Sequence, residues 1–496
     1  MSGKRQTLHP SFIRKKNSSP NMKQFVIGIL LLFGLLPSMA EAESCKHRKK
    51  VEKIEKRYRF RVQLADKKYN TYRLDRPEDF LSPKAIERRQ RLGLKVDSFD
   101  LPISPRYLSA LKNTGVKVFN QSKWNNTVVL ELTDTTLMKR VRSFPFVKGA
   151  RCVWEGPDSV RTGFGLMIED RRAIVTNKQD TLPHYYGHSA KQVEMLGADR
   201  LHRAGYTGKN VTIAVIDGGF FNADAIAGLK DLRILGTKNF AVPGTDTYAE
   251  LDHGMMVLSC IGANQPHFLV GTAPGASFYL IQTEDGRTEQ LVEEDNWCAA
   301  VEYADSVGCD MITSSLGYTL FDYPYMGHKY YEADGRTALN SRSASLAASR
   351  GLVLLNSAGN SGTLPWKKIC FPGDATDILT VGAVDSVKVN TDFSSIGNTA
   401  DHRVKPDVMA MGQDCAVYND DGSMTKVNGT SFSCPILCGA VACLLQAYPT
   451  KTPVEIINAV RQAGDNVPHP DNIFGYGVPD MNKAFQLLKQ SEEGKM

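Results

Sequence analysis

One stretch decides how this chain folds: Asn428-Gly429-Thr430-Ser431-Phe432-Ser433-Cys434-Pro435. It stands directly before an apolar run at 436–448, whose length and spacing are helical. The pattern predicts a tight turn that opens a buried helix, with Ser431 at the helix N-terminus and therefore near the positive end of the helix dipole. A serine in that place is commonly a helix cap. As a nucleophile it would need a base and an orienting group from elsewhere in the chain.

Three stretches further upstream supply groups of that kind. A buried strand pattern ends in Asp217 and two glycines, His253 opens an apolar helical stretch, and a second strand pattern runs into a small, polar turn that holds Asn360. Taken singly, the acid and the Asn are explained by turn chemistry, and the His by a surface position. Those explanations do not account for the occurrence of Asp217, His253 and Asn360 together with Ser431, nor for the chain order Asp, His, Ser.

These stretches resemble the motifs of the subtilisin family of serine proteases, the subtilases, whose catalytic residues follow that chain order. The resemblance covers roughly residues 185–490, and the segments 405–408 and 475–480 fit the family's later sequence. The chain departs from the family pattern at Met255, where Thr is usual, and at Phe432, where Met is usual. We interpret both departures as changes in the packing around the catalytic residues. They would therefore affect the rate and the specificity of the enzyme.

The resemblance implies a role for each of the motif residues. Ser431 would attack the scissile carbonyl, and His253 would take its proton and later deliver it to the leaving amine. Asp217 would hold the imidazole in the right tautomer. Asn360 would donate its side-chain amide to the oxyanion, with the backbone N–H of Ser431 as the second donor.

The resemblance also implies the walls of the substrate site. Ser315, Leu316 and Gly317 are similar to the family's substrate strand, which pairs main chain to main chain with an extended peptide. Ala358 and Gly359 would complete the primary specificity pocket. Neither stretch contains an acidic residue, which favours apolar or mixed substrate side chains over Lys or Arg.

We expect no metal in the active site and no cofactor in the chemistry. Family members often bind structural calcium, but the acidic residues upstream of His253 do not have the spacing of an EF-hand loop. We interpret four of them as solvated surface carboxylates, with structural calcium as the alternative: Asp224, Asp231, Asp246 and Asp252.

Residues 185–490 read as an α/β peptidase domain. Strand patterns fall at 211–216, 277–283, 310–314, 352–357 and 378–384, and helical patterns near 191–202, 253–264, 290–306, 338–349, 430–447 and 453–462. Such alternation predicts a subtilisin-like, mostly parallel sheet flanked by helices. Functional residues gather at the carboxyl ends of such strands. Asp217 and Asn360 stand at two of those ends, which gives a second reason for the motif residues to meet.

Residues 46–155 read as a small α+β domain. Strand patterns fall at 58–64, 116–119, 127–132 and 147–154, and helices are expected to start at Ser82, Ser104 and Asp134. This layout is compatible with a ferredoxin-like sandwich. Its place resembles a subtilase propeptide, which in that family assists folding and then blocks the cleft; a permanently attached accessory domain is the alternative. Residues 156–184 read as an exposed linker, in which a processing cut would fall.

Residues 1–42 read as an N-terminal extension and a signal peptide. Lys23 precedes an apolar run at 25–36, and Ala40-Glu41-Ala42 forms a cleavage pattern. The run is short for a membrane span, so we expect no stable span in the mature form. The protein would be secreted or periplasmic. Attachment to the cell surface, through an uncleaved anchor or through a lipid on Cys45, remains an open alternative.

Composition sets further bounds on the class of protein. The chain is 42% hydrophobic and 23% charged, as in ordinary globular proteins, and its net charge of +7 is small for 496 residues and gives no argument for a nucleic-acid partner. Export permits disulfides among the 10 cysteines. Cys298 with Cys309, or Cys370 with Cys415, are candidate pairs, whereas the cysteines that follow Ser431 read as small buried hydrophobic residues.

Together these features predict a secreted serine endopeptidase, made as a self-processing precursor. Its partners would be peptide or protein substrates and its own propeptide as an intramolecular inhibitor. Two alternatives remain at this stage: a catalytically silent subtilase fold that binds peptides, and a peptide ligase or esterase on the same site. The presence of every catalytic residue type argues against the first, and comparison of hydrolysis with aminolysis would separate the second.

Overall fold

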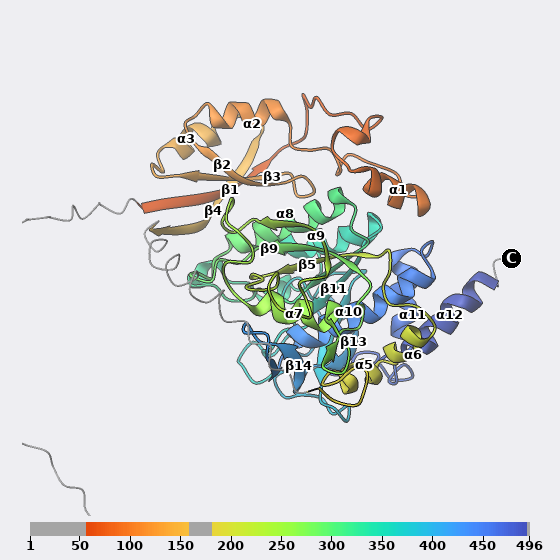
Figure 1. The fold of residues 1–496 in the computed structure, drawn as a ribbon. Helices are drawn as coiled ribbons and strands as arrows, with labels where there is room; N and C mark the ends of the chain where they lie inside the picture. Colours follow the sequence, from red (N-terminus) through yellow and green to blue (C-terminus); the bar gives the residue numbers. More distant parts are fainter. Residues whose placement is uncertain (1–55, 158–180, 494–496) are drawn as a thin grey trace, which may run out of the picture. The chain divides into compact units, whose positions relative to one another are not determined.

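The computed structural model describes residues 56–157 and 181–493 (Figure 1). All of these belong to one compact unit, Ile54–Met496. The predicted signal peptide, Cys45 and most of the predicted linker lie outside the described residues.

A seven-stranded sheet forms the centre of the larger part of this unit. Its strands run in the order β13-β12-β11-β10-β5-β9-β6, and every neighbouring pair is parallel. The strands are β5 Thr212–Asp217, β6 Arg233–Asn239, β9 Ser277–Gln282, β10 Met311–Ser314, β11 Val353–Ser357, β12 Leu379–Val384 and β13 Val408–Met411. The predicted parallel sheet is confirmed. The sequence patterns had not identified β6 and β13.

Helices cover both faces of this sheet (Figure 1). They are α5 Ala190–Met195, α6 Ala198–Arg203, α7 His253–Gly262, α8 Val292–Val307, α9 Leu339–Ser349, α10 Thr430–Ala447, α11 Pro453–Gln462 and α12 Met481–Glu493. Successive residues of a strand point to opposite faces. Accordingly Ile213 and Val215 of β5 pack in one hydrophobic cluster with α7 and α10, and Ala214 and Ile216 pack in the other with α8 and α9.

One predicted helix is divided. The pattern at 191–202 forms α5 and α6 instead of a single helix, because Gly197 between them has φ 70°, a left-handed conformation that ends the first helix. Short elements not expected from the patterns are the hairpin strands β14 Cys415–Tyr418 and β15 Met424–Val427, the pair β7 Asn264–Gln265 and β8 Leu269–Val270, and 3₁₀ turns at Pro77–Asp79, Pro324–Met326 and Tyr330–Glu332.

The helix that begins at the quoted stretch is the central helix of the fold. Within the described ranges, α10 alone is long and apolar enough to cross a membrane, but 83% of it is buried inside the protein. It is therefore a core helix that packs against α7 and several strands of the sheet.

The smaller part of the unit has the ferredoxin-like order β2-β3-β1-β4, with all pairs antiparallel. Its elements are β1 Lys56–Leu64, α1 Pro83–Arg91, α2 Pro105–Lys112, β2 Lys117–Ser122, β3 Thr127–Leu132, α3 Leu137–Arg142 and β4 Val147–Pro157. The predicted α+β sandwich is confirmed. The expectation for Asp134 was wrong: α3 begins later, after Thr136, and the Asp134 carboxylate instead closes a turn by accepting from the Thr136 N–H.

Buried polar contacts join this sandwich to α8. The guanidinium of Arg61 donates to both carboxylate oxygens of Asp295 at 2.7 Å. The Glu302 carboxylate accepts from the backbone N–H groups of Lys123 and Trp124 at 2.7 and 3.1 Å. Both acids lie on α8 and are nearly inaccessible to solvent, so the two parts are held together by contacts that solvent screens little.

Neither candidate disulfide is formed. All nine cysteines of the described residues are free thiols, and all but Cys152 are buried. Cys298 and Cys309 lie in the hydrophobic cluster of α8 and α9, whereas Cys415 lies in the opposite cluster, separate from Cys370. They pack as small apolar side chains, as predicted for those that follow Ser431.

Candidate active site

An acid and a histidine meet where β5 ends and α7 begins. Asp217 is the last residue of β5 and is fully buried, and His253 is the first residue of α7. The His253 Nδ1 lies 2.6 Å from Asp217 Oδ1, which also accepts from the Gly218 N–H at 2.7 Å. Because an ionised carboxylate can only accept, Nδ1 carries the proton of the neutral ring, and Nε2 is left as a base.

Two influences on the His253 ring oppose each other. Burial, the largest single influence, disfavours its charged form, but the charge of Asp217, the hydrogen bond to it and the charges of Asp252 and Glu284 together raise the pKa of His253 above its ordinary value. The side chain is still 39% exposed, so a substrate can reach it.

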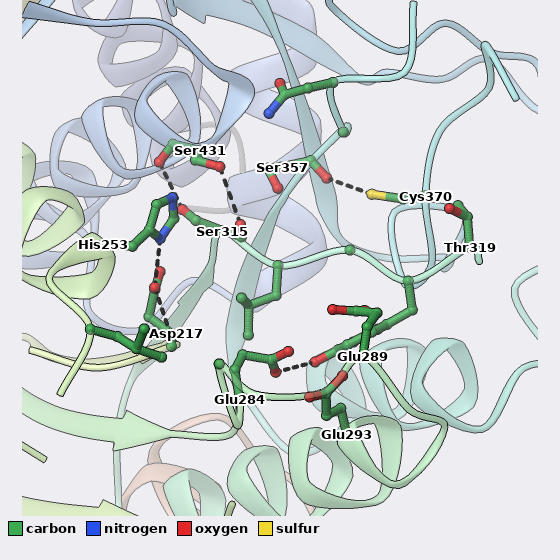
Figure 2. Close-up of a pocket in the computed structure, with 18 of the residues that line it drawn as sticks. Asp217, His253, Glu284, Glu289, Glu293, Ser315, Thr319, Ser357, Cys370 and Ser431 are labelled. Atoms are coloured by element: carbon green, nitrogen blue, oxygen red, sulfur yellow. Dashed lines mark hydrogen bonds and ion pairs between the residues drawn. The ribbon is translucent and has the colours of Figure 1, made fainter. Parts of the chain in front are cut away.

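Ser431 lies on the first turn of α10, facing the cavity that His253 also lines (Figure 2). Its hydroxyl donates to the carbonyl of Ser315 at 3.3 Å, and the Ser315 hydroxyl donates to the carbonyl of Ser431 at 2.8 Å. No hydrogen bond between Ser431 and His253 occurs in the described part of the chain. Catalytic hydrogen bonds are often long or misaligned before substrate binds and tighten in the complex.

Asn360 is held in one orientation by the residue before Ser431. Its Oδ1 accepts from the backbone N–H and from the hydroxyl of Thr430, both at 2.9 Å. A backbone N–H can only donate, so the amide oxygen must face Thr430 and the amide nitrogen must face away from it. Asn360 lines the same cavity, where the nitrogen can donate to a developing negative charge.

Phe432 and Met255, the two departures from the family pattern, are packing residues. Phe432 is 5% exposed and its ring lies 5.8 Å from that of His253, whereas Met255 is fully buried in the core between α7 and α10. Phe432 thus supports the His253 ring from the helix that carries Ser431.

The cavity has a volume of about 640 Å³. Eight of the nine site residues predicted from the sequence line it: Asp217, His253, Ser315, Leu316, Gly317, Gly359, Asn360 and Ser431. Ala358 does not; it is fully buried, with its backbone bonded to Val381 and Cys370, while its neighbour Ser357 faces the cavity. The expectation for Ala358 was therefore wrong.

Sequence reasoning missed a thiol in the cavity wall. A Cβ on Gly317 would overlap the sulfur of Cys370, and one on Gly359 would come within 2.9 Å of it. Glycine at these positions is thus needed to accommodate Cys370 as well as a substrate. Burial raises the pKa of Cys370 to about 12, so its thiol is protonated and is no nucleophile at neutral pH.

Sequence reasoning also missed acidic residues in the cavity. Glu284, Glu289 and Glu293 place carboxylate oxygens within 4.8 Å of one another, and Asp285 and Asp322 also line the cavity. The sequence feature that could have revealed them is the high density of acidic residues between the end of β9 and the start of α8. Among the described residues this is the one group of three or more His, Cys, Asp or Glu side chains close enough to hold a metal, and it contains none of the four surface acids considered for calcium.

Comparison with known proteins agrees with this geometry. A model of the subtilase family of peptidases matches residues 208–477. The chain is a subtilase. A second model, of a peptidase S8 propeptide domain, matches residues 59–161.

Relatives of this subtilase include Subtilisin NAT of Bacillus subtilis subsp. natto, which is 30% identical over 305 residues, 60% of this chain and 72% of the relative. Serine protease AprX of Bacillus subtilis (strain 168) is 27% identical over 304 residues, 55% of this chain and 65% of the relative. A solved structure of MycP1 with the N-terminal propeptide removed has 21% identity and a TM-score of 0.48, and covers 60% of this chain and 96% of that one. The two family models and the subtilisin relatives show that this subtilase is a serine-type endopeptidase with a propeptide domain, and that it matures by processing.

Proposed function

We propose that this subtilase is an exported endopeptidase in which Asp217, His253 and Ser431 form the catalytic triad and Asn360 stabilises the oxyanion. The contact between His253 and Asp217, in a cavity that Ser431 and Asn360 also line, carries the proposal. The hydrogen bonds of Asn360 to Thr430 add support, because they fix its amide in advance.

The proposed reaction follows from these positions. A peptide carbonyl enters beside Ser431, His253 Nε2 takes the hydroxyl proton, and the oxygen attacks the carbonyl carbon. The negative charge on the carbonyl oxygen is met by the Asn360 amide and the Ser431 N–H. The protonated His253 then gives its proton to the leaving amine, and water, deprotonated by the same ring, releases the acyl group from Ser431.

Self-processing and inhibition by the propeptide form the second part of the proposal. The propeptide match ends at residue 161, at the start of the predicted linker, where the cut is expected. The last strand of the sandwich also approaches the cavity: Glu155 and Gln290 exchange hydrogen bonds of 3.0 Å between backbone and side chain, directly beside cavity residue Glu289.

Export is supported by sequence alone. The apolar run at 25–36 and the cleavage pattern at 40–42 favour a secreted or periplasmic enzyme acting on peptides and proteins. The same proposal includes the division of the chain into an extension with signal peptide, a propeptide, a linker and a peptidase domain, at residues 1–42, 46–155, 156–184 and 185–490. It also includes chemistry that needs no cofactor. Activity should accordingly survive a chelator.

Intact masses of the exported wild type and of Ser431→Ala test the proposal. We expect the wild type to lose a segment that ends between residues 155 and 190 and the variant to keep it. A Ser431→Ala variant that hydrolyses peptides at the full rate would refute the triad. If both chains stay full length, labelling of Ser431 by a fluorophosphonate decides whether the site is active, and hydrolysis compared with aminolysis of a peptide ester decides between protease and ligase.

A further inference from the structure

Three carboxylates line the active-site cavity beside the segment that would hold a substrate. Glu284 follows β9, Glu289 lies in the next loop, and Glu293 lies on the first turn of α8. Figure 2 shows the three on one side of the 315–319 segment, with Ser357 and Cys370 on the other. All three line the cavity that contains Ser431.

Ordinary structural roles explain only part of this cluster. An acid on the first turn of a helix is favoured by the helix dipole, which accounts for a residue such as Glu293. Glu284 accepts from the hydroxyls of Tyr318 and Thr283 at 2.6 and 2.9 Å. However, Glu293 is 2% exposed and its Oε2 has no hydrogen-bond partner among the described residues. A buried carboxylate oxygen without a partner is costly, and this one belongs to a side chain that lines the cavity.

The described residues supply no cation that forms an ion pair with the cluster. No Lys, Arg or His in the described ranges forms an ion pair with Glu284, Glu289 or Glu293, and the nearby Arg287 is paired with Asp285. Asp322 adds a further negative charge beside Glu289. Burial raises the pKa of Glu284 to about 8 and that of Glu289 to about 7, and their mutual repulsion adds to the effect in Glu284. All of these groups would be stabilised by a positive charge placed among them.

We propose that Glu284, Glu289 and Glu293 form a subsite for the positively charged side chain of a Lys or Arg in the peptide substrate. The inference rests on the proposed function, because it assigns the occupant of that same cleft. Side chains of an extended peptide alternate between its two faces. A peptide lying along Ser315–Gly317 therefore presents some side chains to the wall of Ser357 and Cys370 and others to the cluster.

Ammonium and guanidinium groups suit this set of acceptors. Each offers several N–H donors to several carboxylate oxygens, and charge-assisted hydrogen bonds of this kind are the strong ones. The sequence-based preference for apolar or mixed side chains considered only 315–317 and 358–359. The acids come from 284–293, which the fold brings to the same cavity.

The test compares the cleavage of matched peptides by the matured enzyme. Positional libraries first identify the peptide position at which Lys or Arg is preferred. We then measure kcat/KM for peptides that differ only by Arg or Gln at that position. We expect the Arg peptide to be preferred, and the ratio to fall about tenfold or more in Glu284→Gln and in Glu293→Gln, as for loss of a hydrogen bond to a charged group.

Two further variants control for folding and for net charge. Glu289→Gln changes the exposed member of the cluster, where a folding defect is not expected, and should also lower the ratio. Asp231→Asn removes the same charge at an exposed position that does not line the cavity, and should leave the ratio unchanged.

The outcomes separate this inference from the proposed function. Hydrolysis of both peptides without preference for Arg at any position overturns the subsite and leaves the triad standing. No hydrolysis of any peptide by correctly processed enzyme overturns the proposed function instead. Stoichiometric divalent metal in the wild type that is lost in Glu284→Gln, measured by elemental analysis, overturns the subsite in favour of a metal site.

Discussion

At the scale of single residues, the hydrogen bond that His253 donates to Asp217 helps to set the pH at which the imidazole becomes a base. Burial is the largest single influence and lowers the pKa of His253, but the charge of Asp217, the hydrogen bond to it and the charges of Asp252 and Glu284 together raise that pKa above its ordinary value. The base must be neutral to accept the proton of Ser431, so the raised pKa means that activity is lost on acidification at a pH above the ordinary value of about 6.5.

We therefore expect kcat/KM to fall below a midpoint higher than about 6.5 in the wild type. In Asp217→Asn the midpoint should move to lower pH, and the rate should drop by up to about 10⁴-fold, as when the orienting acid of such a triad is replaced. The pH profile of peptide hydrolysis measures both effects. An unchanged midpoint in the variant would show that Asp217 does not control the ring.

Asn360 should matter to rate and little to binding. Its amide nitrogen donates to a negative charge that exists only in the transition state. Asn360→Ala should therefore lower kcat by about 10²–10³-fold and leave KM nearly unchanged. The size of the effect is that known for the side-chain oxyanion donor of subtilisin. Thr430→Ser keeps both hydrogen bonds to Asn360 and serves as the control. A rise in KM at constant kcat would contradict the assignment.

At the scale of elements, a buried ion pair ties together the strands and helices behind the site. Asp407, 1% exposed, accepts from Lys405 at 2.6 Å, from the Thr380 N–H at 2.7 Å and from Arg461 at 2.7 Å. It thereby joins β12 to α11 just before β13 begins. The segment 405–408, noted in the sequence for its likeness to the family, has this structural role.

Asp407→Ala should lower the free energy of unfolding by about 3–5 kcal/mol, because it leaves the buried Lys405 without its counter-charge. The double variant Lys405→Met with Asp407→Leu removes both charges and should recover part of the loss. Urea unfolding followed by tryptophan fluorescence measures the difference. A single variant as stable as the wild type would mean that the pair is not buried as described.

At the scale of the whole molecule, polar contacts hold the propeptide-like sandwich on the peptidase part. Arg61 reaches Asp295 from the sandwich, and Arg88 and Arg89 of α1 both reach Asp305 at 2.5 and 3.0 Å. The acids lie on α8, whose first turn carries Glu293 of the cavity. A processed segment that keeps these contacts would remain bound beside the cleft.

A peptide of residues 46–155, added to the mature enzyme, should inhibit it. Arg61→Ala in that peptide should weaken the inhibition by about 30-fold or more, because truncating one partner of a buried charge pair costs about 2–5 kcal/mol. Lys68→Ala, at an exposed pair within the sandwich, is the matched control. The inhibition constant is the measurement. No inhibition by the unmodified segment would make the sandwich an accessory domain.

The sequence by itself determined the alternation of strands and helices and the ends at which Asp217, His253 and Ser431 stand. These features depend on local periodicity, on glycines and on the residues that begin helices, so they can be predicted without knowing which segments meet. The break at Gly197 escaped prediction, because apolar periodicity continues across a residue whose backbone turns left-handed.

Only the tertiary structure decided the surroundings of the catalytic residues. It left Ala358 fully buried and outside the lining of the cavity, placed Cys370 against Gly317 and Gly359, and left the candidate cysteine pairs unbonded. It also brought the acids of 284–293 to the substrate segment at 315–317. Each of these results depends on side chains from distant segments meeting in space, and no periodicity within one segment contains that information.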